Sequence, residues 1–327
     1  MYDNDHGAPP NDAEAIKSLL EAAENGDAKA RYRLGEMYRN GCGVAQDYAE
    51  AMKWYRKAAE QGLADAQVYL GLMYAAGCGV SQDYTEAGKW FRLAADQGSA
   101  NAQRNLGMMY DNGEGVAQDY SKAMMWYRKA AEQGLANAQY YLGEMYRNGC
   151  GAAQDYTEAA KWYAKAAEQG DVYAQNTLGL MYAEGQGVTR SDAEAEKWFR
   201  LAAEQGLAEA QFDLGVMYTE GRGVARDHME AVKWFRLAAE QGMATAQHNL
   251  GVMYTEGRGE GQDYTEAMKW YAKAAEQGLA ESQYNLGQMY YNGHGVAQDY
   301  AEAAKWYQLS AEQGNEIAIN ALEGLKK

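Results

Sequence analysis

The sequence repeats every 36 residues, and this period constrains the fold more than any other feature. A Leu-Gly pair marks each repeat, with its glycine at Gly35, Gly71, Gly107, Gly143, Gly179, Gly215, Gly251 and Gly287. The eight tryptophans keep the same spacing, at Trp54, Trp90, Trp126, Trp162, Trp198, Trp234, Trp270 and Trp306. Units of this length bury their apolar faces against their neighbours. The chain is therefore expected to form a stacked array without a single central core.

Two helices are predicted in the first repeat, Asp27–Gly62. Helix A is expected from about Ala28 to Asn40, where a spacing of about 100° per residue places an apolar stripe on one face. That stripe, predicted to be core, holds Ala30, Leu34, Met37 and Tyr38. Gly41 follows as a residue suited to a left-handed helix cap.

Helix B is predicted to begin after Asp47, which forms a capping box with Glu50. The box recurs at Asp83/Glu86, Asp155/Glu158, Ser191/Glu194, Asp227/Glu230, Asp263/Glu266 and Asp299/Glu302, whereas Lys122 replaces the glutamate after Asp119. The expected buried face of helix B holds Ala51, Trp54, Tyr55, Ala58 and Ala59. Lys53, Lys57 and Glu60 are expected in solvent, and Gly62 ends the helix.

Gly35 lies in the middle of helix A, where glycine costs about 1 kcal/mol relative to alanine. Its recurrence in all eight repeats indicates that a neighbouring helix approaches closely at that turn. The carboxy-terminal segment is in phase with helix A but carries Glu323 at the glycine position, as if no further helix packs there.

The ends of the array are predicted to be capping helices. Residues 11–26 align with helix B, with Asn11 and Glu14 as a capping box and the polar Ser18 at the tryptophan position. Residues 1–10 are predicted to be a disordered tail, 27–314 to be eight repeats, and 315–327 to be a lone A helix. An array that begins with a B helix suggests an A helix upstream of this sequence.

Composition and charge narrow the function classes. The formal net charge is −16, and Lys and Arg recur among acidic residues, so no phosphate-binding stripe and no nucleic-acid partner are expected. The sequence contains no run of about 18 apolar residues, so membrane insertion is not expected. The first ten residues resemble no signal peptide. A soluble protein is expected, either cytoplasmic or exported after removal of a signal peptide, and the oligomeric state is left open.

Three cysteines, Cys42, Cys78 and Cys150, occupy one repeat position. Equivalent points on stacked helices lie about 10 Å apart, whereas a disulfide needs Cα atoms about 4.4–6.8 Å apart. We therefore expect unbridged surface thiols.

The repeat resembles the Sel-1-like repeat, a relative of the tetratricopeptide repeat. The resemblance rests on Leu34-Gly35, Met37-Tyr38, Gly41, Gly43-Val44, Asp47, Ala51, Trp54-Tyr55, Ala58-Ala59 and Gly62. It implies an all-α fold, a right-handed alpha-alpha superhelical solenoid of helix-turn-helix repeats. It also implies a role as an adaptor, assembly factor or host-interaction protein. Some secreted members carry a disulfide in each repeat and a proposed penicillin-related activity, but this chain lacks those paired cysteines.

The sequence offers no catalytic, metal or cofactor site. His6, His228, His248 and His294 are dispersed over different repeats and the tail. No Ser-x-x-Lys, His-Glu-x-x-His or phosphate-binding loop is present. Carboxylates recur at the same positions in every repeat, whereas a catalytic carboxylate pair is expected only once in the chain. The sequence therefore predicts no enzyme.

Positions that vary between repeats lie on helix A, opposite its buried stripe. In the resembling superhelices this face lines a concave groove, and we predict that it binds a protein or peptide. The candidate residues are Tyr32, Glu36, Val68, Leu72, Arg104, Met108, Tyr140, Glu144, Asn176, Leu180, Phe212, Val216, His248, Val252, Tyr284, Gln288 and Tyr291. Exposed apolar patches with aromatic neighbours often mark binding surfaces. Neutral variation on a tolerant surface would produce the same pattern, and so would contact between adjacent A helices.

Three functions are therefore compared. The first is a non-catalytic adaptor or scaffold that uses the groove. The second is an enzyme resembling the penicillin-handling secreted members, which nitrocefin turnover would reveal. The third is a structural or self-assembling solenoid, which light scattering would reveal as a concentration-dependent mass.

Overall fold

The computed structural model describes residues 13–325, and this part of the chain consists of eighteen helices and no strands. The chain divides between Gln169 and Gly170 into two compact units, called here unit 1 and unit 2. The tail predicted at residues 1–10 and the predicted cap Asn11 lie outside the described residues.

Unit 1 begins with a single helix, α1 (Ala13–Glu24), and continues with four helix pairs. Its A helices are α2 (Ala28–Asn40), α4 (Ala64–Ala76), α6 (Ala100–Asn112) and α8 (Ala136–Asn148). Its B helices are α3 (Tyr48–Ala59), α5 (Tyr84–Asp96), α7 (Tyr120–Glu132) and α9 (Tyr156–Glu168).

Unit 2 has the same pattern and ends with a single helix, α18 (Glu316–Leu325). Its A helices are α10 (Val172–Glu184), α12 (Ala208–Glu220), α14 (Ala244–Glu256) and α16 (Ala280–Asn292). Its B helices are α11 (Asp192–Glu204), α13 (His228–Glu240), α15 (Tyr264–Glu276) and α17 (Tyr300–Glu312).

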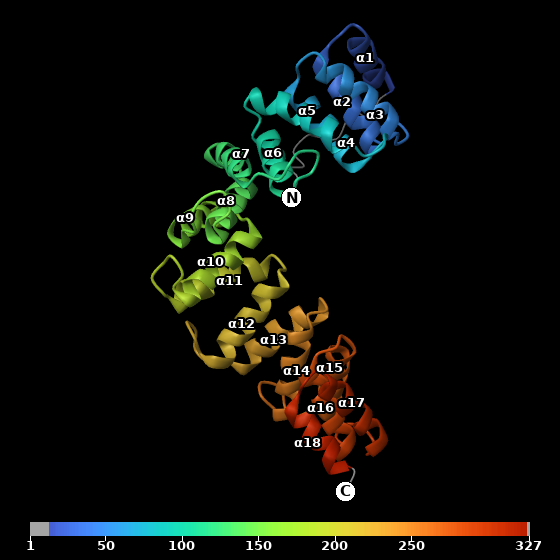
Figure 1. The fold of residues 1–327 in the computed structure, drawn as a ribbon. Helices are drawn as coiled ribbons and strands as arrows, with labels where there is room; N and C mark the ends of the chain where they lie inside the picture. The colour runs from blue at the N-terminus through green and yellow to red at the C-terminus, as the bar shows by residue number, and fades with distance from the viewer. Residues whose placement is uncertain (1–12, 326–327) are drawn as a thin grey trace. The chain divides into compact units, whose positions relative to one another are not determined.

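Within each unit, every A helix packs against the B helix that follows it, and every B helix packs against the next A helix (Figure 1). The predicted fold class, an all-α solenoid of helix-turn-helix repeats, is confirmed. The predicted bounds of the first helix A, Ala28 to Asn40, are also those of α2.

The turn between helices A and B uses two backbone devices. Gly41 ends α2 in the left-handed region, with φ of 70°. The backbone N–H of Asp47 donates to the Tyr38 carbonyl oxygen at 2.8 Å, which ties the start of α3 to the end of α2. The Asp47 carboxylate then accepts from the N–H groups of Ala49 and Glu50, so the predicted cap forms.

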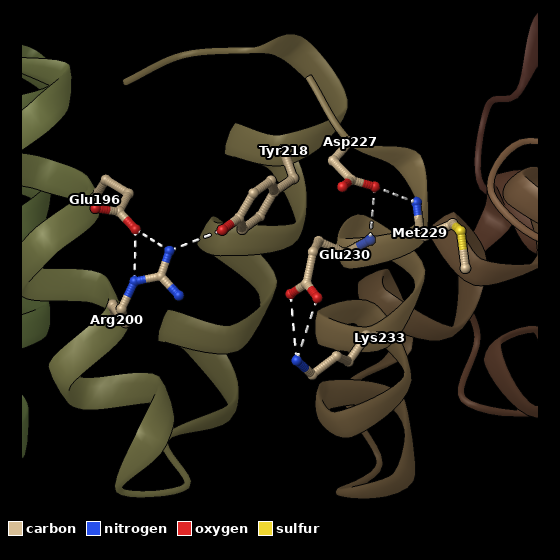
Figure 2. A network of polar contacts seen from close by, with 7 residues as sticks. All are labelled: Glu196, Arg200, Tyr218, Asp227, Met229, Glu230 and Lys233. Atoms are coloured by element: carbon tan, nitrogen blue, oxygen red, sulfur yellow. Dashed lines mark hydrogen bonds and ion pairs between the residues drawn. The ribbon is translucent and has the colours of Figure 1, made fainter. Parts of the chain in front are cut away.

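The glutamate arm of the predicted capping box does not form. In each of the seven repeats that carry the box, this glutamate instead pairs with the lysine three residues further on. Figure 2 shows one case, in which Asp227 accepts from the backbone of Met229 and Glu230 while the Glu230 carboxylate turns to Lys233. The physical reason is that the backbone N–H of the capping residue already donates to a carbonyl oxygen of helix A, as Asp47 does to Tyr38. The glutamate carboxylate therefore pairs with the exposed lysine instead.

In the predicted stripe of helix A, Ala30, Leu34 and Met37 are buried, whereas Tyr38 is only half-buried. Tyr55 and its equivalents on the B helices are at most 3% exposed. The tryptophans divide: Trp126, Trp198, Trp234 and Trp270 are buried, whereas Trp54, Trp90, Trp162 and Trp306 are half-buried. Lysine ammonium groups lie over several indoles, as Lys57 does over Trp54 at 4.2 Å, so basic side chains cover part of the exposed ring face.

A second set of buried contacts was not predicted. From the second repeat on, a helix A glutamine accepts from the glutamine at the end of helix B in the same repeat, at 2.7–2.8 Å, in Gln67/Gln97, Gln103/Gln133, Gln139/Gln169, Gln175/Gln205, Gln211/Gln241, Gln247/Gln277 and Gln283/Gln313. Gln67 also donates to the Ala59 carbonyl oxygen of the preceding helix B at 3.1 Å. In the first repeat, Arg31 takes this role by donating to the Ala23 carbonyl oxygen at 2.9 Å. These glutamines bind the free end of one B helix to the next repeat.

Candidate functional site

The variable face of the A helices is more tightly packed than the sequence suggested. Most of the candidate residues are half-buried, and only Leu180 and Tyr291 are exposed, at 37% and 40%. Val68 was expected as an exposed apolar residue of the groove, and this is wrong, because it is 7% exposed and belongs to the core of unit 1. Leu72 also packs against that core.

Aromatic rings from neighbouring helices explain this burial in unit 1. The Tyr32 ring on α2 lies 5.7 Å from the rings of Tyr55 on α3 and Tyr69 on α4, measured between centroids. Tyr55 and Tyr69 stack at 5.5 Å, and the Arg39 guanidinium lies 4.4 Å from the Tyr69 centroid. Contact between adjacent A helices, one of the alternatives left open by the sequence, therefore accounts for Tyr32. Glu36 pairs with Arg39 on the same helix at 3.5 Å.

Polar side chains close the same face further along unit 1. Glu144 on α8 accepts from the Tyr163 hydroxyl of α9 and pairs with Arg147 at 3.0 Å. Burial, together with this carboxylate, raises the pKa of Tyr163, so its phenol stays protonated as the donor. Tyr140 contacts the Tyr163 ring at 5.8 Å. On α6, Arg104 lies 3.1 Å from the Met108 sulfur.

Unit 2 is different, because two candidate residues meet at an opening between neighbouring A helices. A depression of about 160 Å³ is lined by Val216, Thr219, Glu220, Phe235, Asn249, Val252, Met253 and Arg258. Val216 comes from α12 and Val252 from α14, and Phe235 reaches the depression from α13. Phe235 is held by the Phe212 ring at 5.7 Å.

The rim of this depression carries both signs of charge. Glu220 pairs with Arg222 at 3.1 Å, and Arg258 pairs with Glu256 at 2.6 Å. The Thr219 hydroxyl donates to the Gly215 carbonyl oxygen of its own helix at 2.8 Å, so its polar atom is engaged. The depression therefore has an apolar lining and a rim without a dominant charge.

The remaining candidates of unit 2 are separate from this opening. His248 lies 2.8 Å from the Ser282 hydroxyl, and burial lowers its pKa, so the imidazole is neutral at pH 7. Tyr284 contacts the Tyr307 ring at 5.7 Å and accepts from Gln288 at 2.7 Å. The other three are Asn176 and Leu180, both on α10, and the exposed Tyr291, whose ring contacts Tyr300 at 5.2 Å.

Asp213 on α12 is a residue that the groove prediction left out. Burial raises the pKa of this carboxyl to about 7, and the nearby positive charge of Arg222 opposes the shift. Its repeat position holds Arg33, Tyr69, Asn105, Tyr141, Thr177, Asn249 and Asn285 in the other repeats. That variability is the signal that could have pointed to it, since Asn249 at the same position lines the depression.

No three side chains of His, Cys, Asp or Glu within residues 13–325 are arranged to hold a metal ion. Cys42, Cys78 and Cys150 are unpaired and half-buried, so they are less accessible than the expected surface thiols. Within the same range, none of the helices is long and apolar enough to cross a membrane.

Comparison with known proteins gives a consistent assignment. The Sel1 repeat model matches nine consecutive segments, residues 1–27, 28–63, 64–99, 100–135, 136–171, 172–207, 208–243, 244–279 and 280–315. Among curated proteins, none matches the sequence.

Two solved structures are similar over most of the chain. A protective antigen of uropathogenic Escherichia coli with an SLR fold is 42% identical, with a TM-score of 0.91, over 95% of this chain and 67% of the antigen. A Sel1 repeat protein from Oxalobacter formigenes is 38% identical, with a TM-score of 0.70, over 95% of this chain and 90% of its own.

Proposed function

The chain belongs to the Sel1 repeat family, and from this premise we propose that it is a non-catalytic adaptor that holds a protein or peptide on the A-helix face of unit 2. Sel1 repeat proteins are typically protein-interaction scaffolds, and the family is generally non-catalytic. The proposal adds a location to this general role.

The depression between α12 and α14 is the observation that carries the proposal. Its volume of about 160 Å³ is smaller than the roughly 300–1,000 Å³ of pockets for drug-sized molecules. A space of this size suits one apolar side chain of a larger partner. Anchor side chains that fill such pockets contribute most of the affinity at many protein interfaces.

The rim supports a polypeptide rather than a nucleic acid. Both Glu220 and Arg258 line the depression, and each is paired with a residue of the opposite sign. A peptide backbone with mixed side chains can exchange these pairs for its own, whereas a phosphate backbone would need an excess of cations.

A photo-crosslinking experiment tests the location. The photoreactive amino acid benzoylphenylalanine replaces Val252 at the depression or Leu237, an exposed residue of helix B α13, as the matched control. After irradiation in cells that make the protein, we expect a discrete crosslinked partner from position 252 and none from position 237. Crosslinks of the same partner from 237 alone, or no protein crosslink from 252, would place the site elsewhere.

A substitution then tests the contact itself. Val216→Asp puts a charge in the depression and should reduce capture of the crosslinked partner at least tenfold while the helix content stays unchanged. Leu237→Asp, equally polar but on the B face, should capture like the parent. Val216 packs against the core of unit 2, as Leu72 does against the core of unit 1, so thermal unfolding of Val216→Asp is measured beside capture to separate a lost contact from a lost fold.

A further inference from the structure

A second pocket lies on the B-helix side of unit 1, away from the A-helix face. It has a volume of about 510 Å³ and is lined by Ser121, Met124, Met125, Arg128, Lys129, Glu132, Gly151 and Ala152. The first six residues belong to α7, and the last two belong to the turn between α8 and α9. The volume lies within the range of ligand pockets.

Two of these residues depart from the pattern of the other repeats. Met125 stands where the other seven repeats have lysine, at Lys53, Lys89, Lys161, Lys197, Lys233, Lys269 and Lys305. Ala152 stands where six repeats have valine, at Val44, Val80, Val116, Val188, Val224 and Val296, and one has Glu260. Both departures meet in this one pocket.

The departures explain why the pocket is open and apolar. The turn packs tightly on α7, because a Cβ at Gly151 would lie 2.4 Å from the Tyr120 carbonyl oxygen and 3.2 Å from the Met124 Cβ. The next residue, Ala152, is two methyl groups smaller than valine and leaves space beside Met124. Met125 is 43% exposed. The repeat position whose glutamate pairs with this lysine elsewhere holds Lys122 here, and Lys122 pairs with Asp119 at 3.0 Å.

The cations of the pocket lack carboxylate partners. In unit 2 this repeat position holds two arginines besides Ala272 and Gln308, and both arginines are neutralised: Arg200 pairs with Glu196, and Arg236 pairs with Glu260 at 2.8 Å. Arg128 instead donates to the Tyr146 hydroxyl at 2.7 Å, and Lys129 lies 4.4 Å from the centroid of the Trp126 ring. Within residues 13–325, no ion pair involves Arg128 or Lys129. Two unpaired cations and one carboxylate, Glu132, thus surround an apolar surface in a chain of net charge −16.

We propose that this pocket binds an acidic peptide segment of a partner protein through one apolar anchor side chain. The anchor lies against Met124, Met125 and Ala152, because methionine side chains adapt to apolar surfaces of different shape. A carboxylate next to the anchor pairs with Arg128 and Lys129, whose guanidinium and ammonium groups form strong charge-assisted hydrogen bonds. The pocket does not depend on the adaptor site of unit 2. Its two cations attract an acidic segment, which the negative charge of the rest of the chain would repel.

The probe for this site is a fluorescein-labelled heptapeptide with a central leucine flanked on each side by glutamates. Fluorescence anisotropy with the full chain should show saturable binding that weakens as sodium chloride is raised, because exposed charge pairs are screened by salt. Replacing the leucine of the probe by alanine, or its glutamates by glutamines, should each weaken binding at least tenfold.

Two substitutions restore the residues of the other repeats and should therefore preserve the fold. Ala152→Val fills the space and should weaken probe binding at least tenfold. Met125→Lys removes the apolar wall but adds a cation, so it should abolish the preference of the site for the leucine probe over its alanine variant. The matched control is Met229→Lys, at a methionine of α13 in unit 2 that is 67% exposed, and it should bind like the parent. Val216→Asp should also bind the probe normally, which separates this test from that of the adaptor site.

Three results would overturn the proposal. The first is a probe that fails to bind the parent chain at millimolar concentration. The second is parent-like binding by Ala152→Val together with an unchanged preference for the leucine probe in Met125→Lys. The third is a concentration-dependent dimer that Met125→Lys dissociates without any probe binding, since the occupant would then be a second copy of this chain.

Discussion

At the residue scale, the glycine in the middle of each A helix is explained by one aromatic ring. A Cβ added at these glycines would lie 2.5–2.8 Å from a ring atom of the paired B helix. The pairs are Gly35/Tyr55, Gly71/Phe91, Gly107/Tyr127, Gly143/Tyr163, Gly179/Phe199, Gly215/Phe235, Gly251/Tyr271 and Gly287/Tyr307. The close approach inferred from the sequence is thus a contact between helix A backbone and a buried ring.

Gly179→Leu is expected to destabilise the protein although leucine is the better helix former. The propensity gain is at most about 1 kcal/mol, whereas overpacking against Phe199 costs about 1–3 kcal/mol. Thermal unfolding should therefore begin at a lower temperature, and amide exchange should rise around Leu178 while α16 to α18 stay protected. Gly324→Ala is the control, because a Cβ there meets no atom within 4 Å, and it should not lower the melting temperature. A higher melting temperature for Gly179→Leu would contradict the packing role.

Asp213 gives the protein a pH-dependent stability. Its pKa is raised to about 7 in the folded state by burial, whereas an unfolded aspartate has a pKa of about 3.9. The folded state therefore holds more protons between these values, so the carboxyl lowers stability progressively as pH rises from about 4 to about 7.

Asp213→Asn should remove this dependence. Each unit of pKa shift corresponds to about 1.4 kcal/mol, so we expect the variant to be about 1–3 kcal/mol more stable than the parent at pH 8. At pH 4 the two should differ little. Urea unfolding of both proteins from pH 4 to pH 8 measures this, and parallel curves would show that the carboxyl is solvated in the folded state.

At the element scale, each B helix has an apolar face and a solvated face that differ in their contribution to stability. Trp126 on α7 is 3% exposed, whereas Lys57 on α3 is exposed and lies over the Trp54 ring. We expect Trp126→Ala to cost about 3–5 kcal/mol and Lys57→Ala about 0.5 kcal/mol or less. Chemical denaturation of the two variants provides the comparison, and equal midpoints would refute the assigned faces.

The elements also show what sequence reasoning could reach. Helix bounds, glycine caps and the buried stripes follow from local spacing, so α2 and the role of Gly35 were predicted from residues close in the chain. The burial of Val68 was not, because it depends on residues from several helices that pack into the same core cluster.

Side chains that act over a longer sequence distance were missed for the same reason. Gln67 and Gln97 are 30 residues apart, and only the stacked structure shows that one accepts from the other. The recurrence of both glutamines every 36 residues was visible in the sequence. The spacing of a polar side chain does not, however, distinguish one that forms a buried hydrogen bond from one that faces solvent. Met125 and Ala152 likewise acquire meaning only when the turn after α8 lies on α7.

At the scale of the whole molecule, stability is expected to be local. Repeats contact mainly their neighbours, so an array behaves as a sum of repeat and interface terms. Each unit has its own buried clusters, for example around Tyr55 and Phe91 in unit 1 and around Phe235 and Tyr271 in unit 2. Each also exceeds the roughly three repeats that stacking arrays need for stability.

Residues 1–169 and 170–327, produced separately, are therefore expected to fold. Each fragment should unfold cooperatively and show the same helix content per residue, by circular dichroism, as the full chain. Once folding is established, the fragments separate the two proposed sites. Residues 170–327 should capture the partner crosslinked at position 252, because Val216 and Val252 both lie in unit 2. Residues 1–169 should bind the acidic heptapeptide, because all residues that line the α7 pocket lie in unit 1. Two folded fragments that each bind neither ligand, while the full chain binds both, would mean that these sites depend on residues from both units.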